Sequence, residues 1–280
     1  MYLEFFGLRE APFSLTPDTQ FFLAYGHYRD ALNTLIIALK AGEGFIKVTG
    51  EIGTGKTLLC RKLLNELDSQ FHTTYIPNPM LTPDSLIRAV ADELGIDTVS
   101  IKDQHQIMKE ITLALIEKSK GKQKKQVLLC IDEAQSMPME TLETMRLLTN
   151  LESEKKKLLQ VVLFGQPELD EKLSHNSIRQ LKQRITFSYN LEPLDQHGIG
   201  AYINHRLLTA GSSGTIQFLP KALKMLQRGS HGYPRLVNIL AHKSLILGFG
   251  QGTMLITPQH VKAAIQDTEG AFKLRFWHWS

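Results

Sequence analysis

The stretch FIKVTGEIGTGKTLLCRKLLNEL (residues 45–67) places a glycine-rich loop between an apolar segment of strand length and a segment with helical periodicity. Within it, GEIGTGKT (50–57) fits the pattern G-x-x-x-x-G-K-[ST]. Glycines let successive backbone N–H groups turn toward phosphate oxygens, and the following helix directs its positive end at the same anion. The strand before the loop and the helix after it favour a phosphate-binding loop over an ordinary glycine-rich turn.

The chemistry of such a loop assigns a task to its polar side chains. Lys56 reaches the β- and γ-phosphates of a nucleotide, and the Thr57 hydroxyl binds the Mg²⁺ that accompanies them. We therefore expect ATP with Mg²⁺ as the ligand. The expected nucleotide-binding residues of the loop are Gly50, Glu51, Ile52, Gly53, Thr54, Gly55, Lys56, Thr57 and Leu58.

A second motif, VLLCIDEAQ (127–135), ends an apolar run in two adjacent acids. Asp132, at the tip of the predicted strand, is placed to hold the magnesium ion as a Walker-B acid and so to join the nucleotide-binding residues. Glu133 is placed to polarise an attacking water as a general base, which favours hydrolysis over the chemistry of a small-molecule kinase. The alternative is structural, with Glu133 capping the helix that begins near Pro138.

Three further polar side chains are candidates for the same site. Gln166 ends the apolar segment LLQVVLFG and orients the water together with Glu133, unless it is only a turn residue before a proline. Arg184 precedes the last predicted strand, and Arg235 begins a predicted helix in GYPRLVN. Arginines in such places stabilise phosphate charge from a neighbouring subunit or from a lid, or they are solvated surface charges.

Apolar runs of strand length alternate with segments of helical periodicity over the first two thirds of the chain. The alternation predicts βαβ units and a parallel sheet covered by helices on both faces. After Leu194 the strand signal fades, and four helices punctuated by Gly and Pro are expected. We predict a nucleotide-binding core over residues 1–193, a helical lid over 194–268 and an aromatic tail over 269–280. The expected strands are residues 45–50, 73–78, 126–132, 158–165 and 185–191.

The composition of the 280-residue chain is that of an ordinary globular protein, with 42% hydrophobic and 21% charged residues, and excludes a disordered one. The net charge of +4 permits an anionic partner without requiring one. Cys60 and Cys130 lie in apolar segments without metal-ligand spacing, which indicates a reduced, cytoplasmic protein. The N-terminus has no signal-peptide pattern, and no apolar run reaches the roughly 20 residues of a membrane-spanning helix.

Several motifs occur in order along nearly the whole chain: the glycine-rich loop, IDEAQ, GQPEL, QRI and GYPR, preceded by PFSLTPDTQFFLAYGHYRDAL. Together they resemble the ExeA/GspA-type AAA+ ATPases, and most closely the short, MshM-type members that serve MSHA pilus biogenesis. The loop motifs are specific to AAA+ ATPases in general, whereas PFSLTPD and GYPRLVN are specific to this family. The resemblance implies a P-loop NTPase core of three αβα layers around a five-stranded parallel sheet, with a C-terminal all-helical lid.

The resemblance also implies a role for each candidate residue. The segment from Tyr25 to Tyr28 approaches the adenine, and Arg179 is a rival for the arginine finger. The other implied roles are nucleotide and Mg²⁺ binding by Lys56 and Thr57, Walker B by Asp132 and Glu133, first sensor by Gln166, finger by Arg184 and second sensor by Arg235.

A resemblance of this kind implies slow ATP hydrolysis, and a homo-oligomer or a hetero-oligomer with a pilus or secretion assembly protein at the inner membrane. The expected location is the cytoplasm, peripheral to that membrane. Longer family members continue into a transmembrane segment and a peptidoglycan-binding domain, whereas this sequence stops at Ser280. Binding to the cell wall is therefore expected to need a partner.

Two other functions stay open. One is a DNA-dependent ATPase of transposition or replication initiation, and the other is a nucleotide-dependent scaffold with little turnover. We expect no DNA, because no DNA-binding unit follows the lid and the basic clusters lack interleaved aromatic residues. Glu133 argues against the scaffold.

Two lysine clusters, KSKGKQKKQ (118–126) and EKKK (154–157), precede predicted strands. They bind anionic lipid or an acidic partner, or they are solvated loops. The terminal segment FKLRFWHWS (272–280) holds both tryptophans, Trp277 and Trp279. These side chains contact a membrane or a partner, or they fold back on the lid.

Overall fold

The computed structural model describes residues 1–67, 69–120, 124–151 and 157–273, which form two compact units. The sheet unit consists of Asp30–Glu51 and Leu59–Leu191. The helical unit consists of Met1–Arg29, Ile52–Leu58 and the chain from Glu192 onward. The division into residues 1–193, 194–268 and 269–280 stays a prediction, whereas the compact units group the first 29 residues and the glycine-rich loop with the C-terminal helices.

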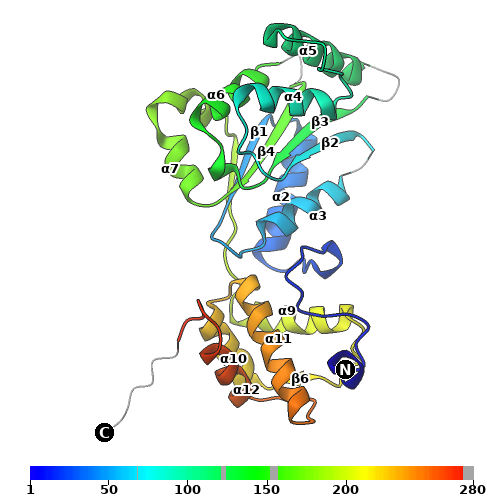
Figure 1. Cartoon of the computed structure of the whole chain (residues 1–280), viewed down its shortest axis with the longest axis vertical. Coiled ribbons are helices and arrows are strands. Elements are labelled where there is room, and N and C mark those ends of the chain that lie inside the picture. The colour runs from blue at the N-terminus through cyan, green and yellow to red at the C-terminus, as the bar shows by residue number, and fades with distance from the viewer. Residues whose placement is uncertain (68, 121–123, 152–156, 274–280) are drawn as a thin grey trace. The chain divides into compact units, whose positions relative to one another are not determined.

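The sheet unit contains five parallel strands in the order β2-β3-β4-β1-β5, so the predicted five-stranded sheet is confirmed (Figure 1). The chain enters β4 after β3 and returns to the centre of the sheet, which inserts β4 between β3 and β1. The carboxyl ends of these three strands therefore lie at one edge. The strands are β1 Phe45–Thr49, β2 Phe71–Ile76, β3 Gln126–Ile131, β4 Leu159–Gly165 and β5 Phe187–Asn190.

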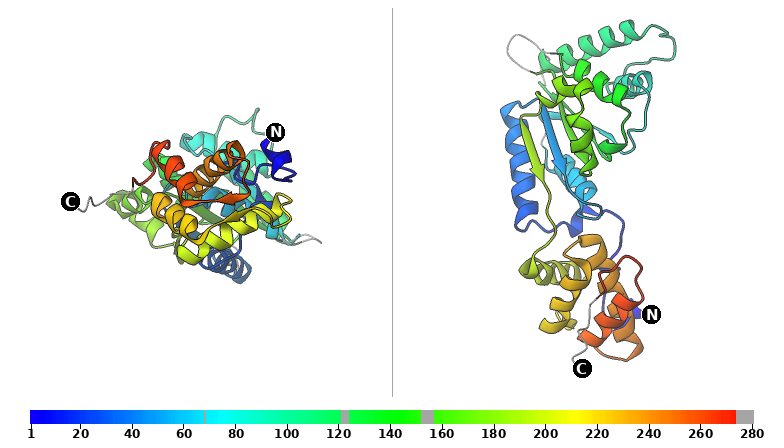
Figure 2. Two further views of the ribbon diagram at one scale, coloured as in Figure 1. Left: turned by 90° about the horizontal axis from the view of Figure 1, so that it is seen from below. Right: turned by 90° about the vertical axis from the view of Figure 1, so that its left-hand side faces the viewer.

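Burial along the strands follows their place in the sheet. Every residue of β4 is buried, as expected for a central strand covered on both faces. The edge strand β5 is mostly exposed. Figure 2 shows α2, which spans His27–Ala41, on one face of the sheet and α6, which spans Met139–Leu148, on the other.

Helices supply the rest of the core of the sheet unit. Leu59 and Leu63 of α3 are fully buried, and α4, α5 and α6 bury apolar side chains in one cluster with β1, β3 and β4. The remaining helices are α3 Lys56–Glu66, α4 Pro83–Glu93, α5 Gln104–Lys120, α7 Glu168–Ser174 and α8 Arg179–Lys182, with 3₁₀ turns η2 Ala134–Ser136 and η3 Asn176–Ile178.

The helical unit contains the four predicted C-terminal helices, and three of them begin with a proline, which has no N–H to leave unsatisfied there. A short parallel pair of strands, β6 Gln217–Phe218 and β7 Leu255–Ile256, was not expected. The unit's helices are α1 Tyr2–Phe5, η1 Thr19–Phe21, α9 Gln196–Thr209, α10 Pro220–Ser230, α11 Pro234–Gly250 and α12 Pro258–Gln266. Among the residues described, no helix combines the length and the apolar character that crossing a membrane requires.

Candidate active site

The glycine-rich loop follows β1 directly and leads into α3, as predicted. Gly53 and Gly55 have φ angles of 83° and 95°, a left-handed conformation that glycine adopts without strain. Lys56 is the first residue of α3 and is 6% exposed, and Thr54 is fully buried. The loop therefore holds its lysine in a largely buried position at the N-terminus of a helix.

Arg235, predicted from GYPR, lies against this loop in the helical unit. It is the second residue of α11, and its backbone N–H donates a hydrogen bond of 3.2 Å to the carbonyl of Gly53. A Cβ added at Gly53 would lie 3.0 Å from Cβ of Arg235. The structure thus brings together two residues that are far apart in the sequence, and the absence of a side chain at Gly53 allows their close approach.

We expect Gly53→Ala to weaken both folding and ATP binding. The left-handed conformation costs an L-residue roughly 1–2 kcal/mol, and the new methyl group also presses on Arg235. Gly252→Ala is the matched control, because Gly252 has a φ of 65° and open space around it. Thermal unfolding and nucleotide titration of both variants give the comparison. If Gly53→Ala and Gly252→Ala lost the same stability and both kept the wild-type ATP affinity, the contact between Gly53 and Arg235 would contribute to neither folding nor ATP binding.

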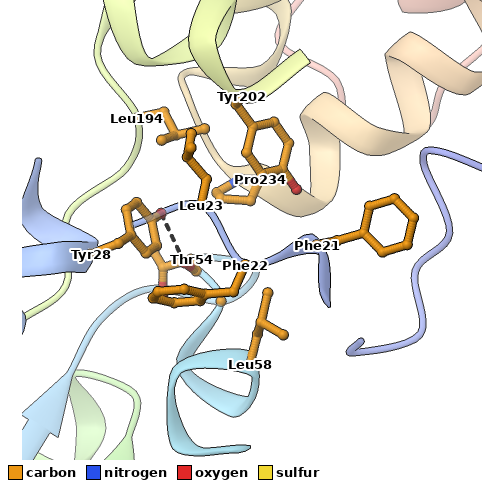
Figure 3. A pocket seen from close by; sticks show the side chains of 10 residues that line it. Phe21, Phe22, Leu23, Tyr28, Thr54, Leu58, Leu194, Tyr202 and Pro234 are labelled. Carbon is orange, nitrogen blue, oxygen red and sulfur yellow. Dashed lines mark hydrogen bonds between the residues drawn. The ribbon is translucent and has the colours of Figure 1, made fainter. Parts of the chain in front are cut away.

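An apolar pocket lies beside the loop in the helical unit (Figure 3). It encloses about 340 Å³ of space, a volume that includes open solvent. The Tyr28 hydroxyl donates a hydrogen bond of 2.9 Å to the carbonyl of Thr54, and burial raises the pKa of Tyr28, so the phenol stays neutral. The lining residues are Phe21, Phe22, Leu23, Tyr28, Thr54, Gly55, Leu58, Leu194, Tyr202 and Pro234.

A buried arginine that none of the sequence motifs marks supports two walls of this pocket. Arg206, on α9, is 3% exposed, and its guanidinium lies 4.6 Å from the ring centre of Phe21. It also donates to the Tyr202 hydroxyl at 3.0 Å and to the carbonyls of Pro12 and Ser14. Arg206 thereby fixes both aromatic side chains and ties the N-terminal segment to α9.

At the tip of β3, the predicted Walker-B residue Asp132 is 2% exposed. Its Oδ1 accepts the backbone N–H of Glu133 at 2.9 Å, and its Oδ2 accepts the Tyr75 hydroxyl at 3.3 Å. Burial and the charge of Asp132 raise the pKa of Tyr75 to about 12, so this hydroxyl remains a donor at neutral pH. These contacts hold the carboxylate in one orientation.

The structure brings Glu133 and Gln166 together, as predicted, and adds Gln135 to them. Oε2 of Glu133 accepts Nε2 of Gln135 at 2.6 Å and Nε2 of Gln166 at 3.1 Å. The structural alternative for Glu133 is not seen, because its side chain caps neither η2 nor α6. The three side chains form a strand-tip cluster at the carboxyl ends of β3 and β4.

The two candidate finger arginines differ in their surroundings. Nη1 of Arg184 donates to the carbonyl of Arg146 at 3.0 Å and to the Thr149 hydroxyl at 3.2 Å, at the C-terminal end of α6. Arg179, the first residue of α8, is exposed. Within its own chain, Arg184 therefore satisfies a helix-terminal carbonyl, a common task of arginine.

Several predicted features lie wholly or partly outside the described residues. They include most of the EKKK cluster, part of KSKGKQKKQ, and Trp277 and Trp279. The described part of the aromatic segment is Phe272 and Lys273. The ring of Phe272 stacks on that of His231 at 3.5 Å between centroids, and Phe272 is 41% exposed. The aromatic tail begins with a contact to the helical unit.

A family model described as "AAA domain" matches residues 39–173, which include the loop, Asp132, Glu133 and Gln166. General secretion pathway protein A of Aeromonas hydrophila is 41% identical over 273 residues, which cover 96% of this chain. The match covers 49% of that relative, so the chain spans about half its length.

Solved structures with similar folds include three proteins of low sequence identity to this chain. The Aeropyrum pernix ORC2 protein in its ADP form is 15% identical with a TM-score of 0.67, and the match covers 91% of this chain and 72% of the ORC2 chain. Cdc6p from Pyrobaculum aerophilum is 20% identical with a TM-score of 0.65, covering 88% and 70%. The Thermotoga maritima RuvB Holliday junction branch migration motor is 17% identical with a TM-score of 0.54, covering 85% and 67%. At these identities the likeness concerns the fold alone.

The matched residues 39–173 include β1, the glycine-rich loop, β3 with the acids that follow it, and β4. Residues 39–173 thus match an AAA domain model, the fold is that of P-loop NTPases, and the chain is similar to general secretion pathway protein A over nearly its whole length.

Proposed function

We propose that the protein is an ATPase that binds ATP with Mg²⁺ and hydrolyses it. The observation that carries the proposal is the strand-tip cluster, in which Glu133 and Gln166 meet beside the buried Asp132. Because β1 and β3 are parallel strands of one sheet, the loop that starts at Gly50 and the acids after Ile131 begin at the same edge. In open α/β sheets, ligands bind at this carboxyl edge.

The residues divide the work according to their chemistry. Lys56 would neutralise the β- and γ-phosphates of the nucleotide, and Thr57 and Asp132 would hold the magnesium ion. Glu133 accepts the proton of the attacking water, and Gln166 orients that water. Arg235 senses the nucleotide from the N-terminus of α11, where its backbone already contacts the loop.

The apolar pocket beside the loop is proposed to take the adenine ring. Its aromatic and aliphatic walls suit a flat heterocycle, and its contact with Thr54 and Gly55 places it next to the phosphate-binding backbone. Tyr28, from the YGHY segment, forms one wall and donates its hydrogen bond to the loop rather than to a ligand. The pocket thus supports a purine nucleotide over a free phosphate.

We infer that hydrolysis serves assembly of a type II secretion apparatus or of a type IV pilus of the MSHA type. The name of the Aeromonas relative and the family motifs support this proposal. In this role the chain works as an oligomer, alone or with an assembly protein, at the cytoplasmic side of the inner membrane. DNA is not expected to stimulate turnover, and measuring ATPase rates with duplex DNA at several salt concentrations checks this.

We expect Lys56→Ala to abolish ATP binding while the fold is retained, because removal of the ammonium leaves the phosphate charge uncompensated. Lys62→Ala is the matched control on the same helix, where Lys62 pairs with Glu66 at 2.7 Å on a partly exposed face. Titration with a fluorescent ATP analogue and thermal unfolding are measured for both. ATP affinity equal to that of the wild type in Lys56→Ala would refute the phosphate-loop assignment.

A further inference from the structure

Gln135 joins the tips of two neighbouring strands through one side-chain amide. Its Nε2 donates to Oε2 of Glu133 at 2.6 Å, and its Oε1 accepts the backbone N–H of Gln166 at 3.0 Å. The amide is thus used as donor and acceptor at once. One side chain thus contacts both residues that are proposed to act on the attacking water.

The local backbone is shaped to bring Gln135 back over Glu133. Glu133 has φ 50° and ψ 36°, a left-handed conformation that is unusual for a residue other than glycine. The 3₁₀ turn that follows is closed by Ser136, whose N–H and hydroxyl donate to the carbonyl of Glu133 at 2.9 and 2.8 Å. A conformation of this kind is unfavourable for a residue with a side chain, and it persists because these contacts over-determine it.

The partner strand leaves room for the amide. Gly165 ends β4, and a Cβ at that position would lie 3.3 Å from Oε1 of Gln135 and 2.7 Å from a methyl group of Leu169. The missing side chain therefore lets the Gln135 amide reach the backbone N–H of Gln166. The turn after β3 and the glycine at the end of β4 thus both allow the two hydrogen bonds that the Gln135 amide makes.

We propose that Gln135 is a positioning residue that fixes the Glu133 carboxylate for attack by water, an inference that rests on the proposed ATPase function. Among the described residues, both amides that contact this carboxylate bind Oε2, so Oε1 is the oxygen that receives the proton. Gln135 makes the shorter of the two bonds, at 2.6 Å against 3.1 Å for Gln166. When Gln166 turns to the water or the phosphate, Gln135 still holds the carboxylate.

The test compares turnover, nucleotide affinity and stability in Gln135→Met, which keeps the length of the side chain and removes both hydrogen bonds. We expect kcat to fall about 10- to 100-fold, the range that follows from misplacing a reacting group by about 1 Å. The Kd for ATP is expected to stay at its wild-type value, because the hydrogen bonds of Gln135 go to the strand tips. A small fall in Tm is expected, since the backbone N–H of Gln166 loses its acceptor. Gln135→Asn retains an amide but shortens its reach, and we expect the same loss of kcat.

A double variant separates positioning from a general structural role. In the Glu133→Gln background, Gln135→Met should lower the residual rate no further, because Gln135 acts only through that carboxylate. Gln160→Met is the matched control: Gln160 lies on β4, and its amide donates to the carbonyls of Leu39 and Glu43 at 3.0 and 2.7 Å. This control should lower the Tm and leave kcat per folded molecule unchanged.

The outcomes are distinct. Wild-type kcat in Gln135→Met and Gln135→Asn, together with a large loss in Glu133→Gln, would overturn the role of Gln135 and leave the ATPase proposal standing. An equal further loss in the Glu133→Gln background would also overturn it, because the residue would then act independently of Glu133. Absence of ATP hydrolysis by the wild-type protein under all conditions would defeat the proposed function and this inference together.

Discussion

Glu133→Gln is expected to bind ATP as the wild type does and to lose most hydrolysis, by roughly 10²–10⁴-fold. An amide has the shape of the carboxylate, and its oxygen still accepts the hydrogen bonds of Gln135 and Gln166. It does not accept the proton of the attacking water. Binding and chemistry should therefore separate, and single-turnover measurements with saturating enzyme read the chemical step directly.

The control for this variant is Glu140→Gln on α6, an exposed glutamate that undergoes the same change of charge. Its rate should equal that of the wild type. Turnover of Glu133→Gln close to the wild-type rate would make Glu133 a structural residue and would move the general base elsewhere.

Arg184→Ala is expected to impair hydrolysis without weakening ATP binding to the isolated subunit, because the proposed finger acts on a neighbouring protomer. An arginine finger contributes on the order of 10³–10⁵ in rate in the best cases. The same substitution removes the donor to the carbonyl of Arg146, so α6 loses a C-terminal contact. Thermal unfolding therefore has to accompany the ATPase assay.

Mixing variants distinguishes the two effects. Arg184→Ala subunits keep their nucleotide pockets and lack the finger, whereas Lys56→Ala subunits lack the pocket and keep the finger. Combined, they should recover part of the lost activity, since some interfaces pair a good pocket with a good finger. An inactive mixture of variants that still co-assemble would contradict the role in trans. Recovery seen only with Arg179→Ala would transfer the role to that exposed arginine.

The sheet and the polar residues at the tips of β3 and β4 could be predicted from the sequence, because both depend on local patterns. Apolar runs place the strands within a few residues of their observed bounds, and polar residues that end such runs, Asp132 and Gln166, mark the strand tips. Gln135 was missed although it stands in the quoted motif. Its role depends on the left-handed backbone conformation of Glu133. Because this residue is not a glycine, no local sequence pattern predicts that conformation.

Other features depend on contacts between distant segments. From the sequence, Arg206 is expected to be a surface charge on an ordinary helix. Its burial depends on distant residues, among them Pro12 and Ser14, whose carbonyls accept its hydrogen bonds. The strands β6 and β7 have two residues each, too few for an alternating pattern. The grouping of Ile52–Leu58 with the C-terminal helices is likewise set by packing, and the sequence carries no separate signal for it.

The make-up of the helical unit has a consequence for the order in which the chain acquires its structure during synthesis. Its segment Met1–Arg29 is synthesised before the C-terminal helices of the same unit. Arg206, which donates a hydrogen bond to the carbonyl of Pro12, is synthesised 194 residues after that proline. Phe6, Phe13 and Phe21, all buried in the finished unit, wait through that interval without their C-terminal partners. Contacts of such long range form slowly, and apolar side chains exposed meanwhile invite aggregation. A chain that ends at Leu191 and has been released from the ribosome should therefore show a protease-resistant sheet unit and a protease-sensitive N-terminus that binds chaperones.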